Sequence, residues 1–533
     1  MKSWRLCVCI GAIAALAAMT CGLLATPPLA YADPQPSPPS LPSPHLGYGI
    51  NVRDPGVVDS LFAPLGFEWL KLWEEYGTEQ APTLPQARYP YKVLFLIDCT
   101  GRSGDLEAWG EAVEAIATAG KSLVEAYEIC NEPNRSGWLN AGVSPAQPDP
   151  GLYVRMLQVA YERIEAVDAG AIVVSAGLAP VGRIQDTCAR WRGNNCQVMD
   201  EQEYARQMLL LGAGDSCDAF GYHPYGFAYE PERAPDELPP DDDGNGFAFR
   251  GVKAMYALLE QHGLGYKPVW ATEFSWLRDP HEDGALPGWC HRIGDYENPF
   301  GWMDVPEVQQ ADYITRAFQY ADEHWPWMGA MFVWNLDWYD YGWQCDPARY
   351  FSVLKVDYTV YNPHAVFWQP DNLVTPPGTG AGSTAESIVA APYTMTLAYD
   401  ALVAMEKRPG HFGPRLAVLP PALTIVADVD EPGTLTGVVV PLNAGYGVFT
   451  WTATVVAGMQ VTPTLAVTTG LQGTPLTVTV DSTGYVTGTF MGAIAVTGVT
   501  TDVLDAPQVV TVTLRVVPEL YRVYLPVAIR SMP

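Results

Sequence analysis

The sequence is short of basic residues. Its 533 residues include 30 lysines and arginines against 59 aspartates and glutamates, so the formal net charge at pH 7 is −29. A surface this acidic repels nucleic acid and anionic membranes. Charged residues make up 17% of the chain and apolar residues 48%, a balance typical of a folded protein. These proportions favour a neutral partner over a nucleic acid.

Nucleotide and metal signatures are also missing. No glycine-rich dinucleotide fingerprint or P-loop occurs, and none of the ten cysteines has the spacing of a zinc site. No cluster of histidines or aspartates stands at ligand spacing. The sequence therefore predicts a function that needs neither a cofactor nor a metal.

Long apolar runs are confined to the first 32 residues. Lys2 and Arg5 precede an apolar stretch from Leu6 to about Ala25, and Leu29–Ala32 offers an Ala-x-Ala cleavage site. We interpret residues 1–32 as a secretory signal; a membrane anchor or a lipid-modified Cys21 are the alternatives. No later segment is apolar for long enough to span a bilayer. Cleavage would leave 28 basic against 59 acidic residues, a net charge of −31, which suits a secreted or cell-surface protein.

Seven cysteines remain after such a cleavage. Cys188 and Cys196 bracket a short polar loop and are expected to pair in an oxidising compartment. Cys290 and Cys345, in two later loops, are a second candidate pair. The other three, Cys99, Cys130 and Cys217, lie in or beside apolar runs and are expected to be buried thiols.

Apolar strands alternate with helical patterns through most of the chain. After a Pro/Ser-rich linker at residues 33–45, eight strands are predicted at 47–52, 67–73, 91–98, 126–132, 171–179, 218–225, 268–276 and 329–338. Continuous apolar runs indicate strands buried on both faces. Helical patterns fill most of the gaps, at 105–120, 151–169, 201–212, 247–263 and 306–325, and a last one follows at 394–407. The pattern predicts an α/β fold, a (β/α)8 TIM barrel over residues 46–413.

The composition changes near residue 413. Residues 414–517 are dense in Thr, Val and Gly, show strand alternation and lack a helical pattern. They predict an all-β, immunoglobulin-like sandwich whose only tryptophan, Trp451, belongs to its core. A short amphipathic tail at 518–533 ends the chain.

Polar residues stand where the barrel strands are expected to end. In a TIM barrel, functional residues collect at the carboxyl ends of the strands. Two glutamates there, Glu132 and Glu273, could face one another across the barrel mouth. Glycoside cleavage needs such a pair, one protonated to release the leaving oxygen and one ionised. The strand-end residues are Lys71, Trp73, Asp98, Asn131, Glu132, His223, Tyr225, Glu273, Trp334 and Asn335.

Three of these strand ends resemble those of a known group of enzymes. The sequence has NEP at 131–133, HPY at 223–225 and ATEFSW at 271–276. In this order they resemble clan A retaining glycoside hydrolases, closest to the cellulase/β-xylosidase-like groups, over residues 46–413. The resemblance implies that Glu132 is the general acid/base and Glu273 the nucleophile of a covalent glycosyl-enzyme.

The same resemblance implies roles for the neighbours of the two glutamates. Asn131 would bind the sugar 2-hydroxyl, Tyr225 would orient Glu273, His223 would line the site, and Trp334 would be a sugar platform. Many members carry an arginine on the second strand where this chain has Lys71. A lysine is a point donor and cannot form a bidentate fork.

Structural interpretations stand beside the functional ones. Glu132 could belong to an ordinary turn, His223 and Tyr225 to the core, and Trp334 to barrel packing. Lys71 and Asp98 could form an ion pair with no catalytic role. Glu273 is different, because a lone carboxylate in an apolar strand is costly to bury without partners.

Two functions follow from these residues. The first is a secreted retaining glycosidase acting on a poly- or oligosaccharide. The second is a non-catalytic glycan-binding or cell-surface protein on a degenerate barrel, which the Lys71 departure and the appended sandwich would suit. The sandwich resembles the BACON-type modules of secreted carbohydrate enzymes through FTWTATV, TPLTVTVDSTG and GTFMGAIAVTG; glycan or surface attachment would be its role.

Overall fold

The structure is a computed structural model that describes residues 45–74, 84–135, 147–182, 198–239, 247–283, 301–339, 348–357, 393–408, 410–499 and 503–520. The predicted secretory signal at 1–32 and the predicted linker lie outside these ranges, apart from His45, as does the predicted tail beyond residue 520. Among the described residues, no helix combines the length and the apolar character needed to cross a membrane.

Eight parallel strands form the central sheet, in the order β5-β4-β3-β2-β1-β10-β7-β6. Parallel bridges Val174–Ala219 and Leu178–Tyr222 join β5 to β6, so the sheet closes into a barrel. The predicted TIM barrel is thus confirmed, although every strand is shorter than expected and the sixth spans only 3 of the residues predicted at 218–225. The strands are β1 (Gly47–Asn51), β2 (Trp69–Trp73), β3 (Lys92–Ile97), β4 (Ala126–Asn131), β5 (Ile172–Gly177), β6 (Phe220–Tyr222), β7 (Val269–Phe274) and β10 (Met328–Val333).

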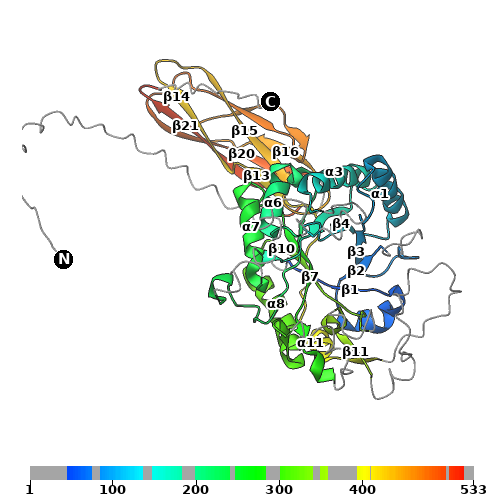
Figure 1. Cartoon of the computed structure of the whole chain (residues 1–533). Helices are drawn as coiled ribbons and strands as arrows, with labels where there is room; N and C mark the ends of the chain where they lie inside the picture. The colour runs from blue at the N-terminus through cyan, green and yellow to red at the C-terminus, as the bar shows by residue number, and fades with distance from the viewer. Residues whose placement is uncertain are drawn as a thin grey trace, which may run out of the picture. The chain divides into compact units, whose positions relative to one another are not determined.

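Amphipathic helices surround the barrel (Figure 1). They are α1 (Leu106–Gly120), α3 (Pro150–Val167), α6 (Glu201–Leu210), α7 (Val252–Gln261), α8 (Glu307–His324) and α11 (Leu397–Ala404), with a short α9 (Ala348–Phe351). Asp105, Asp149 and Asp200 cap three of them, because each carboxylate accepts from backbone N–H groups of the first turn. Between β1 and β2, the proline- and glycine-bearing segment 55–65 forms short 3-10 and π turns.

Side chains inside the barrel follow the period of two that strands impose. On β2, Trp69, Lys71 and Trp73 lie in line, and on β7 Trp270 precedes Thr272 by the same step. The inward positions near the amino ends of the strands are apolar and form one buried cluster. In this cluster, Trp69 and Trp270 pack edge to face with their ring centroids 5.1 Å apart. Tyr446 joins this cluster and accepts a hydrogen bond from Trp270 Nε1 at 2.9 Å. The amino end of the barrel interior is therefore filled with rings.

Residues beyond 413 form two antiparallel-rich sheets. One has the order β13-β15-β19-β17 and the other β14-β21-β20-β16-β18. Their inward residues make one core around Trp451, which is fully buried as expected. The strands are β13 (Leu416–Leu419), β14 (Ala422–Asp428), β15 (Thr434–Asn443), β16 (Thr450–Val455), β17 (Thr464–Leu465), β18 (Thr469–Leu471), β19 (Leu476–Asp481), β20 (Gly488–Gly498) and β21 (Gln508–Val517). The predicted β-sandwich is confirmed, and its immunoglobulin-like character stays a prediction.

Short two-stranded β-ladders lie in the loops that connect the main elements. They are β8 (Leu277–Arg278) with β9 (Asp304–Val305), and β11 (Leu354–Val356) with β12 (Tyr393–Met395).

The expectation for two of the cysteines was wrong. Cys99 and Cys130 are joined in a disulfide, whereas both were expected to be buried thiols. Each follows or ends a barrel strand, β3 and β4, and these neighbouring strands bring the two Cα atoms to 5.1 Å. Cys217 is a buried thiol, as expected. The pairs expected between Cys188 and Cys196 and between Cys290 and Cys345 lie outside the described residues.

Candidate active site

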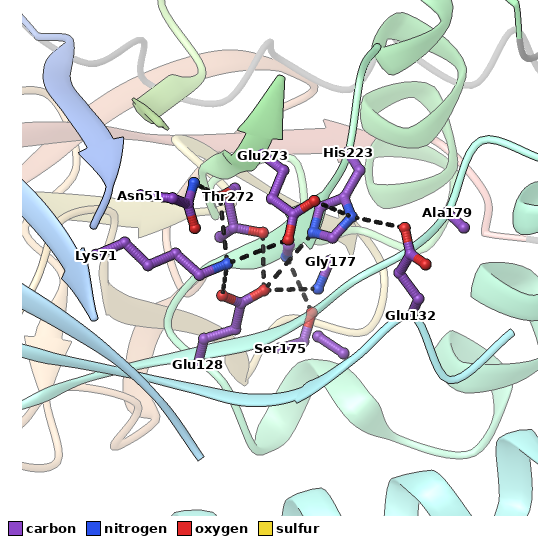
Figure 2. A network of polar contacts seen from close by, with 12 residues as sticks. Asn51, Lys71, Glu128, Glu132, Ser175, Gly177, Ala179, His223, Thr272 and Glu273 are labelled. Atoms are coloured by element: carbon purple, nitrogen blue, oxygen red, sulfur yellow. Dashed lines mark hydrogen bonds and ion pairs between the residues drawn. The ribbon is translucent and has the colours of Figure 1, made fainter. Parts of the chain in front are cut away.

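Five charged side chains meet at the carboxyl end of the barrel (Figure 2). Lys71 comes from β2, Glu128 and Glu132 from β4 and its end, His223 from the end of β6, and Glu273 from β7. All five are buried, with at most 8% of any residue exposed. Parallel strands of a barrel end at the same face, so residues 200 positions apart in sequence become neighbours.

The two predicted glutamates, Glu132 and Glu273, lie on either side of His223. His223 Nδ1 lies 3.1 Å from Glu132 Oε1 and 3.5 Å from Glu273 Oε2. One oxygen of each carboxylate and a His223 nitrogen all fall within 4.8 Å of one another. Tyr225 donates its hydroxyl to Glu273 Oε2 at 2.6 Å. The barrel thus brings together Glu132, His223, Tyr225 and Glu273, four of the predicted site residues.

Glu128 completes the lower part of the cluster and was missed by the sequence analysis. Its Oε2 lies 2.6 Å from Lys71 Nζ, and its Oε1 accepts from Thr272 Oγ1 at 2.8 Å and Gly177 N at 3.0 Å. A signal existed, because Glu128 is a carboxylate in an apolar strand, the argument that singled out Glu273. Gly177 is required here, since a Cβ at this position would lie 2.0 Å from His223 Nε2.

Lys71 lies between two carboxylates. Besides its ion pair with Glu128, Nζ stands 3.8 Å from Glu273 Oε1 and donates to the Thr272 carbonyl at 3.3 Å. The suggested ion pair between Lys71 and Asp98 is absent from the described part of the chain. Asp98 instead accepts from the Thr100 hydroxyl and N–H, while Glu74 pairs with Arg102 above it. Asp98 therefore supports the loop after β3 and makes no hydrogen bond or ion pair with the paired glutamates in the described part of the chain.

Glu132 also has a partner on the solvent side. Arg135 Nη1 donates to Glu132 Oε2 at 2.7 Å, and the Arg135 side chain is 50% exposed. Glu132 itself has φ of 41°, in the left-handed region that is costly for a residue with a Cβ. The backbone turn at the end of β4 thus aims the Glu132 carboxylate across the barrel mouth toward Glu273.

The surroundings move the pKa values of these groups in different directions. Burial raises the pKa of Glu132, but the His223 hydrogen bond and the Arg135 charge outweigh burial and lower it to about 2. Burial also raises the pKa of Glu273, and the charges of His223 and Lys71 offset only part of that rise. For His223, burial lowers the pKa, yet Glu273 and Glu132 together raise it above its ordinary value. These shifts favour an ionised Glu132 and a protonated His223 in the free protein.

Aromatic side chains line one side of the site. Trp334 packs on Trp73 at 5.3 Å and on Trp338 at 4.7 Å between ring centroids. Trp73 lies 4.8 Å from Lys71 Nζ and donates Nε1 to Asn51 Oδ1. Trp334 stays partly exposed while Asn335 is buried, with its Oδ1 accepting from the Trp338 N–H. The position of Trp334 suits both the predicted platform and barrel packing.

Asn131 ends β4 beside the glutamates and is 3% exposed. Its Oδ1 makes no hydrogen bond to any residue that the structure describes. A buried amide oxygen without a protein donor needs an external one, such as a hydroxyl group.

Glu132, His223 and Glu273 also have the composition of a metal site. Two cations oppose that use, because Arg135 lies 2.7 Å from Glu132 and Lys71 lies 3.8 Å from Glu273. The Tyr225 hydroxyl occupies Glu273 Oε2 as a donor. The arrangement suits carboxylates that exchange protons better than carboxylates that coordinate a cation.

Comparison with known proteins gives structural likeness without sequence relatives. No protein-family model matches the chain, and no curated protein matches it. A GH128 endo-β-1,3-glucanase from Amycolatopsis mediterranei superposes with TM-score 0.36 at 14% identity, over 68% of this chain and 99% of that one. A β-glucuronidase 2 variant from Bacteroides uniformis gives 0.39 at 10%, over 89% and 46%. A GH5 endo-β-1,4-glucanase from Bacillus licheniformis gives 0.33 at 12%, over 89% and 78%. At likeness this low, an argument for function has to rest on the geometry of the site.

Proposed function

We propose that this chain is a secreted retaining glycoside hydrolase that cleaves O-glycosidic bonds of a poly- or oligosaccharide by double displacement. The observation that carries the proposal is the pair Glu132 and Glu273, whose nearest carboxylate oxygens lie within 4.8 Å in a buried site at the barrel mouth. Retaining enzymes hold their two carboxyl groups about 5–5.5 Å apart, and inverting enzymes leave room for a water. The separation therefore favours direct attack by one carboxylate.

Glu273 is the proposed nucleophile. The Tyr225 hydroxyl fixes Oε2 at 2.6 Å, while Oε1 accepts no hydrogen bond within the described chain. Attack on the anomeric carbon would form an ester to Glu273 and expel the leaving oxygen, which takes a proton from Glu132. Water then attacks the ester, with Glu132 acting as the base. Asn131 Oδ1 would accept a hydrogen bond from the 2-hydroxyl, and Trp334 would stack on a sugar ring.

Glu132 must carry a proton when the leaving group departs, yet it is ionised in the free site. His223 solves this problem, because its Nδ1 lies 3.1 Å from Glu132 Oε1. Transfer of the Nδ1 proton would leave a neutral imidazole and a neutral carboxylic acid. Arg135 opposes the transfer, but its half-exposed side chain can be displaced by a sugar entering the mouth. Substrate binding would then raise the pKa of Glu132 by removing a cation and water together.

The charge pattern of the free site also admits the reverse assignment, with Glu132 as nucleophile and Glu273 as acid. Covalent trapping of the glycosyl-enzyme distinguishes the two assignments. A 2-deoxy-2-fluoro glycoside with a good leaving group, incubated with the mature chain, is expected to add one sugar to a peptide that contains Glu273. A sugar on the peptide that contains Glu132 would reverse the roles. The sugar of the reagent is chosen from a screen of aryl glycosides and polysaccharides.

Leaving-group dependence tests the acid in a second way. Glu132→Gln should lose far more activity on alkyl or disaccharide leaving groups than on dinitrophenyl glycosides, which depart without protonation. Equal losses on both would contradict the proposed acid. A purified chain that binds glycans but hydrolyses nothing on a broad panel would favour the non-catalytic alternative.

Secretion is part of the proposal. The Cys99–Cys130 disulfide suits an oxidising compartment, in line with the leader at residues 1–32. The sandwich is proposed to attach the enzyme to a glycan or to the cell surface, as its resemblance to BACON-type modules suggests.

A further inference from the structure

The buried carboxylate of Glu128 has no part in the reaction proposed above. Glycoside cleavage needs two carboxylates, and Glu132 and Glu273 supply them. Glu128 is nevertheless fully buried, and each of its oxygens has a specific partner: Lys71 on one side, Thr272 and Gly177 on the other. Burying a third negative charge beside two others costs stability. A carboxylate in this position is therefore expected to have a functional role.

Glu128 controls where the Lys71 ammonium lies. Lys71 Nζ stands 2.6 Å from Glu128 Oε2 and 3.8 Å from Glu273 Oε1, so the closer carboxylate is Glu128. Figure 2 shows the ammonium between the two carboxylates, with Glu128 below it. A lysine ammonium is a compact charge on a flexible stem, so its place depends on its partners. The ammonium also contacts the Thr272 carbonyl at 3.3 Å and lies 4.8 Å from the centre of the Trp73 ring, but Glu128 is its nearest charged partner.

We propose that Glu128 is a positioning residue that partly neutralises Lys71 and keeps its ammonium beyond hydrogen-bond distance of Glu273 Oε1. The Lys71 charge then still offsets part of the rise that burial causes in the pKa of Glu273, while Oε1 stays free of a tight ion pair. A full ion pair would stabilise the carboxylate before attack more than in the transition state, which slows the reaction. The proposal rests on the nucleophilic role assigned to Glu273 above.

Glu128→Gln tests this idea with little change of shape. The amide oxygen can still accept from Thr272 and Gly177, but the charge facing Lys71 is gone. We expect the ammonium to move to Glu273 and the pKa of Glu273 to fall. The acidic limb of kcat/KM, which reports protonation of the nucleophile, should shift to lower pH by about one unit or more. We also expect kcat to decrease.

Two further variants separate charge from structure. Thr272→Val removes one hydrogen bond to Glu128 and keeps every charge, so its acidic limb should stay at the wild-type pH even if kcat or Tm falls. Lys71→Met removes the cation, so its limb should move to higher pH. A Glu128→Gln enzyme whose limb stays in place, or moves to higher pH, would overturn the proposal. If Glu128→Gln does not fold, Glu128→Asp should give a smaller shift toward lower pH.

A titration without substrate keeps this test independent of the proposed function. Protein labelled with 13C at the Glu side-chain carboxyl is titrated by NMR, and the Glu273 signal is identified by its loss in Glu273→Gln. The pKa of Glu273 should be lower in Glu128→Gln than in the wild type. An unchanged or higher pKa overturns the positioning role, whatever the activity. If the wild type hydrolyses no sugar but the pKa of Glu273 is lower in Glu128→Gln, only the proposed function is refuted.

Discussion

The two ends of the barrel interior solve opposite problems with the same strands. At the amino end, Trp69 and Trp270 pack with other rings in a cluster that water does not reach. Two residues further along the same strands, Lys71 and Thr272 belong to a buried set of charges and hydrogen bonds. The first arrangement buries apolar area and stabilises the fold. The second holds three carboxylates close together, an arrangement that lowers stability and makes chemistry possible.

The two ends of the barrel interior are expected to contribute differently to stability and to activity. Variants at the ring-filled end should change the free energy of unfolding and leave the chemistry alone. At the charged end, removing the charge of Glu273 should change activity and leave stability equal or higher. A variant that breaks this division would show that the two ends are coupled.

The largest effect is expected from Glu273→Gln. Loss of the nucleophile should lower kcat/KM by about 10⁴-fold or more, equivalent to about 5 kcal/mol of transition-state stabilisation. The Tyr225 hydroxyl can still donate to the amide oxygen, and one buried negative charge disappears, so the Tm should be equal to or above that of the wild type. Steady-state kinetics and calorimetry measure both quantities. A large fall in Tm would mean that Glu273 is a structural residue.

Trp270→Ala should have the next largest effect, at the opposite end. Removing this buried ring should cost about 3–5 kcal/mol of stability. At a temperature where the variant is folded, kcat/KM should match the wild type. Denaturant unfolding and activity of the same preparation give the comparison. Activity that falls while the variant is still folded would contradict the division between the two ends.

Tyr446→Phe is a smaller change at the same end. It leaves the ring in place and removes the oxygen that accepts from Trp270 Nε1 at 2.9 Å. A buried indole N–H without an acceptor should cost about 1–3 kcal/mol. The double variant Tyr446→Phe/Trp270→Phe should lose less than the two single losses combined, because they share one hydrogen bond. Additive losses would show that this bond does not contribute.

Arg135→Gln should have the smallest effect, a shift of the pH dependence of activity in one direction only. Without this cation the pKa of Glu132 rises from its lowered value of about 2. Glu132 acts as an acid only while protonated, so the alkaline limb of the pH profile should move to higher pH. Because the Arg135 side chain is half exposed, the shift should be less than about one unit. A shift to lower pH would contradict the role of Glu132 as the acid.

The order of strands and helices could be predicted from the amino-acid sequence. Eight apolar runs separated by amphipathic helices predict a barrel because continuous apolar strands need cover on both faces. The change to Thr- and Val-rich alternation after residue 413 predicts the sandwich for a similarly local reason. Glu132 and Glu273 could be singled out because each stands at a strand end, and strand ends of a barrel share one face.

Which charged side chains become neighbours could not be predicted, because it depends on how the strands are arranged in the closed barrel. Glu128 lies on β4 and Glu132 directly follows it, but the partner of Lys71 depends on which strands are neighbours and how far along the barrel axis each side chain lies. The same closeness of β3 and β4 joined Cys99 to Cys130, which local hydrophobicity had marked as separate thiols. Periodicity along one strand tells which residues point inward. Distances between side chains of different strands, and the pKa values they set, exist only once the barrel closes.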